Sequence, residues 1–234
     1  MTLIIALEGT NYVVIGADSK GSGGYMARVD SLNEEKMLTL SKYCAVLISG
    51  NAEIGIELIE EFKVKFKSLN GLSVSQIVKK FSTFCRKNIV VFTDTMAPNH
   101  PAFPDFDYIV TGLNKKGRTF SPQTNILRSR SLFFPGRVKN KATEGEKHIA
   151  DYLIGEEYDR TVDQETMCFL SGKILAKTIK INGNVGGKIK IGVIDKSGLR
   201  ILPDDNVETY TTSTKEEYDY SQLRDKIQKV SEEK

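Results

Sequence analysis

The sequence predicts an α+β fold in which two sheets pack face to face and pairs of helices cover their outer sides. Three observations predict it. Apolar runs of β character open the chain, two helical patterns follow them, and a second set of strands is followed by two more helical patterns and a closing hairpin. Each such element has one apolar side, and stacking two sheets between helix pairs buries all of these sides at once.

The first fifty residues predict two hairpins. Residues 2–8 and 12–17 are β-rich runs on either side of Gly9-Thr10-Asn11, which is typical of a hairpin with a three-residue loop. Residues 36–40 and 44–49 repeat the pattern around residues 41–43. The chain therefore begins with four short strands.

Helical periodicity begins after Gly50. Apolar residues recur every four positions from Ile54 to Phe66, which predicts an amphipathic helix. A second helix is predicted from Ser73, because Ser73-x-x-Gln76 has the form of a capping box. Three prolines between residues 98 and 104 end regular structure before the next strand.

The second half predicts strands at 106–111, 118–120 and 132–134, and helices at 147–154 and 162–180. Thr161-x-x-Gln164 is the expected cap of the last helix, and residues 188–194 and 199–202 form the closing hairpin. We expect one domain over residues 1–204 and a polar, partly helical tail over 205–234. In the tail, one helical stripe would consist of Tyr220, Leu223, Ile227 and Val230.

Composition excludes several classes of function. A net charge of +3 over 234 residues is too weak to indicate a nucleic-acid partner. No apolar run approaches the roughly 20 residues that cross a bilayer, and the N-terminal residues do not resemble a signal peptide, so we expect no membrane association and a cytoplasmic protein. Cys44, Cys85 and Cys168 are far apart in apolar segments, which favours reduced, buried thiols over a disulfide or metal site. No cofactor is expected.

Thr2 is the first candidate for chemistry. A hydroxyl is a poor nucleophile unless a base removes its proton, and a free α-amine on the same residue can be that base. The amine has an unperturbed pKa near 8, close to working pH. Thr2 follows Met1, and a small second residue permits removal of the initiator methionine. Once Met1 is removed, Thr2 would carry both nucleophile and base.

Charged residues at two strand ends complete the candidate site. Asp18 ends the second predicted strand and Lys36 opens the third. Adjacent paired strands would place Lys36 beside Thr2, with Asp18 holding the ammonium, which would lower the pKa of the threonine. Gly50 leads from a strand into a helix, so its N–H, near the positive end of that helix, is a candidate oxyanion donor.

These segments resemble a known family. Thr2-Leu3-Ile4-Ile5-Ala6, Gly16-Ala17-Asp18-Ser19-Lys20, Glu35-Lys36-Met37 and Ile48-Ser49-Gly50-Asn51-Ala52 are similar to the proteasome β subunits and their bacterial and archaeal relatives, which are N-terminal-nucleophile hydrolases. The segment from Gly186 to Gly198 resembles the closing hairpin of that family. The resemblance covers about 200 residues and implies a four-layer αββα sandwich with two antiparallel sheets between helix pairs.

Carried over residue by residue, the resemblance makes Thr2 the nucleophile and base, Lys36 its tuning group, Asp18 the group that orients Lys36, and Gly50 the oxyanion donor. It implies a threonine protease that degrades peptide or protein substrates. It also implies a homo-oligomeric ring, and it leaves open an ATPase or another ring as a partner. Ile48 and Ala52 flank the expected pocket and indicate an apolar preference.

The sequence departs from the family pattern beside the threonine. The family places an aspartate and a serine just before its Gly-Gly pair to support the threonine amine, whereas this chain has Asn182 and Val185. Its Gly-Ser-Gly segment is replaced by Thr143-Glu144-Gly145-Glu146, in which Glu144 is a candidate for the missing acid.

Two alternatives to hydrolysis remain open. One is an acyl transferase that passes the acyl group to an amine, similar to the proteasome-like protein ligases. The other is a structural ring subunit in which Thr2 is never exposed, because an amide nitrogen that is still joined to Met1 has no basic lone pair.

Overall fold

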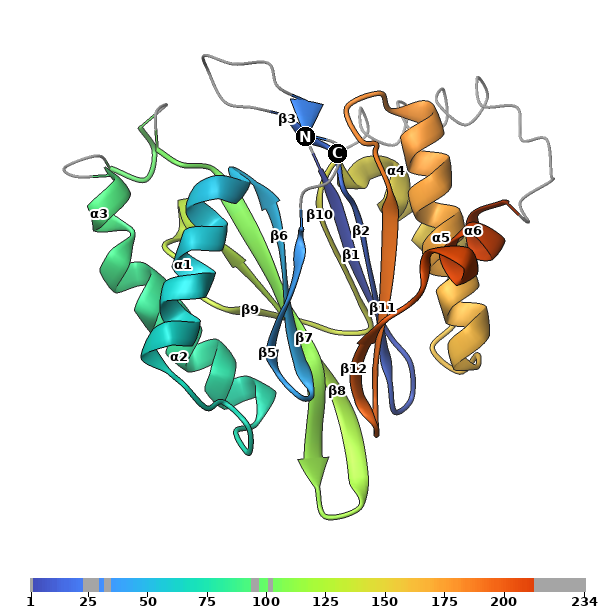
Figure 1. The fold of residues 1–234 in the computed structure, drawn as a ribbon, viewed down its shortest axis with the longest axis horizontal. Coiled ribbons are helices and arrows are strands. Elements are labelled where there is room, and N and C mark those ends of the chain that lie inside the picture. The colour runs from blue at the N-terminus through green and yellow to red at the C-terminus, as the bar shows by residue number, and fades with distance from the viewer. Residues whose placement is uncertain (1, 23–29, 32–34, 94–96, 101–102, 213–234) are drawn as a thin grey trace.

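The computed structural model describes residues 2–22, 30–31, 35–93, 97–100 and 103–212. Two five-stranded antiparallel sheets pack face to face, with α1–α3 outside one and α4–α6 outside the other (Figure 1). The predicted four-layer αββα sandwich is therefore confirmed. None of the helices in the described ranges is both long and apolar enough to cross a bilayer.

The first sheet carries the N-terminal strands. Its order is β10-β1-β2-β11-β12, and each neighbouring pair is antiparallel. The strands are β1 (Leu3–Glu8), β2 (Val13–Asp18), β10 (Lys141–Gly145), β11 (Ile189–Asp195) and β12 (Gly198–Ile201). Every residue of β1 and β2 is buried, because the strands lie in the middle of the sheet between α5 and the second sheet.

The second sheet has the order β5-β6-β7-β8-β9. Its strands are β5 (Met37–Ser41), β6 (Cys44–Gly50), β7 (Phe106–Lys116), β8 (Thr119–Arg128) and β9 (Gly136–Val138). A separate two-stranded ribbon joins β3 (Gly21–Ser22) to β4 (Asp30–Ser31). The short 3-10 turn η1 (Ser129–Ser131) follows β8.

The helices form the two outer layers. Beside the second sheet lie α1 (Ala52–Lys65), α2 (Val74–Asn88) and α3 (Val90–Thr93), and beside the first sheet lie α4 (Lys147–Glu157), α5 (Gln164–Ile181) and α6 (Asp204–Thr212). The predicted capping box is present, since the Ser73 hydroxyl accepts the Gln76 N–H and the Gln76 side chain accepts the Ser73 N–H. The predicted Thr161 cap of α5 is wrong, because Asp163 accepts the Thr166 N–H at 2.8 Å.

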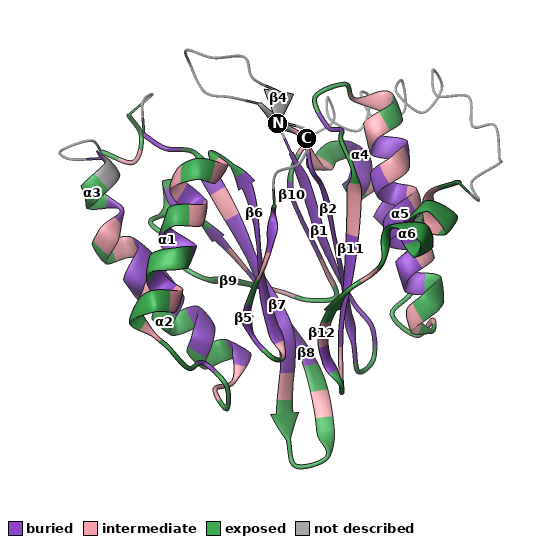
Figure 2. Cartoon of the chain, in the orientation of Figure 1, coloured by how far each residue is buried: buried purple, intermediate pink, exposed green. Residues whose placement is uncertain are grey.

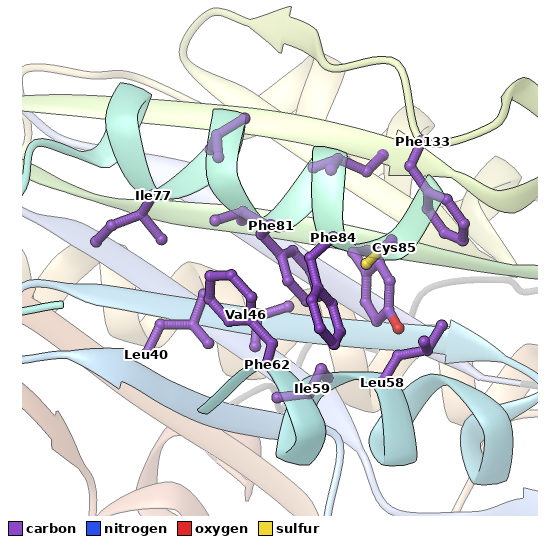
Figure 3. Close-up of a cluster of buried hydrophobic side chains, with 14 of the residues drawn as sticks. Leu40, Val46, Leu58, Ile59, Phe62, Ile77, Phe81, Phe84, Cys85 and Phe133 are labelled. Carbon is purple, nitrogen blue, oxygen red and sulfur yellow. The ribbon is translucent and has the colours of Figure 1, made fainter. Parts of the chain in front are cut away.

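Apolar side chains fill the three spaces between the four layers, and Figure 2 shows in purple which parts of the strands and helices are buried. The core between α1, α2 and the second sheet is rich in aromatic rings. In Figure 3, Phe62 of α1 lies against Phe81 and Phe84 of α2, with ring centroids 5.0 and 5.5 Å apart. Aromatic pairs at such distances add about 0.5–1.5 kcal/mol each beyond their burial. Cys44, Cys85 and Cys168 are buried free thiols, as predicted.

The expected elements and the structure differ mainly between residues 118 and 145. β8 continues to Arg128, and β9 and β10 follow, whereas the apolar residues at 132–134 form no strand. Leu132 and Phe133 instead have positive φ angles of 50° and 56°, and Phe133 is buried in the aromatic core. At the C-terminus, α6 begins at Asp204. The helical stripe expected over residues 220–230 lies outside the described residues.

Candidate active site

A buried ion pair joins the two sheets. The Lys36 ammonium lies 3.1 Å from Asp18 Oδ1, and the side chains are 1% and 0% exposed. The carboxylate also accepts the backbone N–H groups of Leu3 and Gly186 at 2.9 and 3.0 Å. Lys36 also donates to the carbonyl of Lys20 at 2.5 Å. A buried pair is tolerated only when such additional hydrogen bonds satisfy its remaining donors and acceptors.

The pair forms across the sandwich rather than along one sheet. Asp18 ends β2 in the first sheet, whereas Lys36 precedes β5 at the edge of the second sheet. The expectation that the two residues lie on adjacent paired strands is therefore wrong. The Lys36 carbonyl accepts the Ile48 N–H at 3.0 Å, so Lys36 extends the pairing of β5 with β6, and its side chain reaches Asp18 on the facing sheet.

Two backbone hydrogen bonds fix the position of Thr2, one from the N–H of the next residue and one to its own carbonyl. The N–H of the next residue, Leu3, donates to the same Asp18 oxygen that binds Lys36, and the Thr2 carbonyl accepts the Glu146 N–H at 2.8 Å. Along β1, Ile4 and Ala6 face the space between the sheets. Since strand residues two apart share a face, Thr2 lies on that face, at the end of the strand.

Two glycines with positive φ stand beside Thr2. Gly50 ends β6 with φ +89°, and a Cβ there would lie 2.3 Å from the Asp105 carbonyl oxygen. Gly145 ends β10, also with φ +89°, and its Cβ would lie 1.9 Å from the Thr2 carbonyl oxygen. Both positions require glycine for backbone conformation and for space. At Gly145, the requirement comes from Thr2 itself.

Thr2 and Gly50 line one cleft of about 440 Å³ at this end of the sandwich. Asp18 and Lys36 do not line it and are buried in the protein interior, where Asp18 accepts the N–H of Leu3, the residue after Thr2. Most of the other lining residues are polar: Ser49, Asp105, Asp107, Arg128, Glu144, Glu146, Lys147 and His148. Neither Ile48 nor Ala52 lines the cleft, and Ile48 is buried in the aromatic core, so the expectation of an apolar pocket is not supported.

A carboxyl pair forms one wall of the cleft. Burial is the largest of the causes that raise the pKa of Asp107 to about 7; the charge of the neighbouring Glu144 and a hydrogen bond between the two carboxyls add to it, while Arg128 opposes the shift. Arg128 bonds to Glu144 and lies 3.7 Å from Asp107. Lys147 lies 3.5 Å from Glu144. The Glu144 carboxylate therefore interacts with three neighbours, Asp107, Arg128 and Lys147.

Glu146 is a further acidic residue of the cleft, and its backbone contacts Thr2. Its Oε2 accepts a 2.8 Å hydrogen bond from Asn182 Nδ2, and its backbone N–H binds the Thr2 carbonyl. No ion pair to Glu146 occurs among the described residues. Glu146 thus differs from Glu144, which Arg128 and Lys147 hold in ion pairs. Val185, at the position of the expected serine, is buried in the core beside α5.

Sequence reasoning missed several cleft residues. Asp107, Arg128 and Glu146 lie at strand ends or in a turn, and nothing in the sequence around them signals which strands pair. His148 also lines the cleft, and nothing in the sequence around it indicates a role. In the part of the chain that the structure describes, no group of three or more His, Cys, Asp or Glu residues is arranged to hold a metal ion.

Comparison with known proteins supports the fold. No protein-family model matches the sequence, and no curated protein matches it. Among solved structures, the chain is similar to Anbu, the ancestral β-subunit from Yersinia bercovieri. The TM-score is 0.73 at 11% identity over 91% of this chain and 92% of that one. The molecule therefore has a proteasome-like fold.

Proposed function

We propose that the chain is a threonine-type N-terminal-nucleophile hydrolase whose nucleophile is Thr2 after removal of Met1. One observation carries the proposal. Thr2 and Gly50 line the same cleft, while the amide that follows Thr2 shares an Asp18 oxygen with the buried Lys36 ammonium. A buried cation near the start of the strand that follows the threonine is an arrangement that activates the threonine hydroxyl.

The proposed reaction has two acyl-transfer steps. Thr2 Oγ1 attacks the carbonyl carbon of a substrate amide, and its proton passes to the freed α-amine. The oxyanion that forms accepts the Gly50 N–H, which costs no reorganisation because the backbone there is fixed. Collapse of this intermediate breaks the C–N bond, the leaving amine takes the proton, and an ester on Thr2 remains. Water then attacks the ester with the amine again as base; the bond between the acyl carbon and Oγ1 breaks, a carboxylic acid leaves, and the amine returns the proton to Oγ1.

Lys36, Asp18 and Glu146 have the remaining roles in the proposed reaction. Lys36 lowers the pKa of the threonine through its charge, and Asp18 fixes the ammonium in place. Glu146, oriented by Asn182, stabilises the α-ammonium that forms when the amine takes up the proton. The surrounding protein is a homo-oligomeric ring in the cytoplasm that admits peptide or protein substrates, with an ATPase or other ring as a further partner.

Intact mass spectrometry tests this proposal. The purified chain is weighed before and after treatment with a threonine-directed epoxyketone, alongside Thr2→Ala and Thr2→Ser variants. We expect loss of the Met1 mass and one adduct on the native chain, an adduct on Thr2→Ser, and none on Thr2→Ala. Retained Met1 without an adduct would contradict the proposal and favour the structural subunit. If an adduct forms, adding hydroxylamine during peptide turnover separates hydrolysis from transfer to an amine.

A further inference from the structure

A groove of about 430 Å³ lies on the outer helical layer, far from the Thr2 cleft. It runs between the C-terminal end of α1 and the outward face of α2. Phe66 and Phe84 supply its apolar surface, and four exposed lysines surround them: Lys65, Lys79, Lys80 and Lys87. No acidic residue lines the groove.

In the part of the chain that the structure describes, none of these four lysines forms an ion pair. The amines of Lys65 and Lys80 instead lie 5.5 and 5.1 Å from the ring centres of Phe84 and Phe66. The whole of α2 has four basic residues and no acidic one. The groove therefore fits an apolar or aromatic group that is flanked by negative charges.

Exposed apolar side chains surround this face. The described chain has six exposed large hydrophobic side chains, and four of them are Val64 on α1, Val90 and Val91 on α3, and Phe134. Arg86 of α2 lies 4.6 Å from the Phe134 ring centre, which places Phe134 at the edge of the same layer. Most of the exposed large apolar side chains of the described residues thus belong to the outer layer that carries the groove or to its edge.

The chain itself contains a segment of complementary chemistry. Residues 216–220 read Glu216-Glu217-Tyr218-Asp219-Tyr220, with three carboxylates and two aromatic rings. We propose that this segment of a second copy of the chain binds in the groove between α1 and α2. The rings would lie against Phe66 and Phe84, and the carboxylates would face the four lysines.

The length of the tail favours binding to the groove of a second copy over binding to the groove of the same chain. α6 ends at Thr212 and packs against α5, on the outer layer opposite α2. Tyr220 is eight residues further on, which spans at most about 28 Å when fully extended. Four layers spaced roughly 10 Å apart put the outer layers about 30 Å apart through the body. A path around the outside of the body is longer still.

The contact has a consequence for assembly. The groove lies on one outer layer, and α6, which leads into the tail, lies on the other, so the proposed contact joins two different surfaces and is heterologous. Repeated contacts of this kind close into a ring when the rotation permits, and otherwise build an open helical array.

Charge reversal in the full-length chain tests the contact. Lys79→Glu/Lys80→Glu and Glu216→Lys/Glu217→Lys are each examined by sedimentation velocity. Each should shift the protein toward smaller species, because like charges then face each other. An equimolar mixture of the two should restore the native assembly, since each tail then meets an opposite groove. Lys115→Glu/Lys116→Glu, at the exposed β7–β8 turn, is the matched control and should leave assembly unchanged.

Other results would overturn the proposal. Assembly that is restored in a chain carrying all four reversals but not by mixing would show a contact within one chain. Assembly that responds equally to the control would show a general effect of charge. A direct measurement is the fluorescence anisotropy of a labelled peptide of residues 213–222 on the Glu216→Lys/Glu217→Lys chain. Binding should weaken about tenfold or more when Lys79 and Lys80 are also reversed, and absence of binding would contradict the proposal.

Discussion

Lys36 Nζ lies 3.1 Å from Asp18 Oδ1, and the same oxygen accepts the amide hydrogen of Leu3. One carboxylate thus fixes both a buried cation on one sheet and the strand that begins at Thr2 on the other. The pair ties the position of the candidate nucleophile to the packing of the two sheets, so stability and activity respond together when it is broken.

Removing one partner of the pair should be strongly destabilising. We expect Lys36→Met and Asp18→Asn each to lower the free energy of unfolding by about 3–5 kcal/mol, because each leaves a buried polar group without its partner. The double variant should lose less than the sum of the two, by about 1 kcal/mol or more. Urea unfolding measures all three.

An exposed pair provides the control for this cycle. Lys63 and Glu60 lie 2.9 Å apart on the surface of α1, 39% and 51% exposed, so Lys63→Met should cost at most about 1 kcal/mol. Equal losses at Lys36 and Lys63 would contradict the role given to burial. The Lys36/Asp18 double variant should remain inactive even where it is folded, which separates the chemical role from the structural one.

Glu146→Gln should slow the reaction more than it destabilises the protein. The amide keeps the size of the side chain but removes the charge that stabilises the Thr2 α-ammonium, so kcat should fall about 10²-fold with a smaller change in KM. Glu146→Asp should recover part of the loss. Glu144→Gln is the comparison: it leaves Arg128 and Lys147 without their shared carboxylate and should reduce stability as well. Equal kinetic effects of both changes would argue against a separate role for Glu146.

Asp107 should make stability depend on pH. Its pKa is raised from 3.8 to about 7, so between these values the folded protein keeps a proton that the unfolded chain has released. The free energy of unfolding should therefore fall as pH rises from about 4 to 7, by on the order of 2–4 kcal/mol from this group. Asp107→Asn imitates the protonated form and should remove that part of the dependence. Urea midpoints of the native chain and of Asp107→Asn at pH 5 and pH 8 measure the difference. Equal losses of stability in the two proteins between these pH values would contradict the raised pKa of Asp107.

The sequence predicts the layers better than it predicts the cleft. Apolar periodicity locates α1 and α2 and the strands before them, because those signals are local. β8 beyond Phe120 is harder to predict, since Thr124 and Asn125 are polar yet buried. They are buried because polar partners in neighbouring strands satisfy them, as when Thr124 bonds to Thr111 at 2.8 Å.

The candidate site shows the same division between local and distant signals. Thr2, Asp18, Lys36 and Gly50 each stand at a recognisable strand end, and the structure brings Thr2 together with Gly50 and Asp18 together with Lys36. That Lys36 approaches from the facing sheet depends on how the sheets stack. The proximity of Glu146 and Asn182 depends on the packing of α4 and α5, since 36 residues separate them in sequence.

Gly145→Ala should disrupt the site more than an equivalent change elsewhere. Gly145 and Gly71 have nearly the same φ, +89° and +91°, but a Cβ at Gly71 meets nothing within 4 Å, whereas one at Gly145 lies 1.9 Å from the Thr2 carbonyl oxygen. Gly71→Ala should therefore show backbone strain alone, about 1–2 kcal/mol. Gly145→Ala adds a clash that moves Thr2, so it should cost more than that and also abolish the epoxyketone adduct. Urea unfolding and intact mass, measured on both variants, check the two parts. An adduct on Gly145→Ala at the native rate would mean that the position of Thr2 does not depend on this close approach.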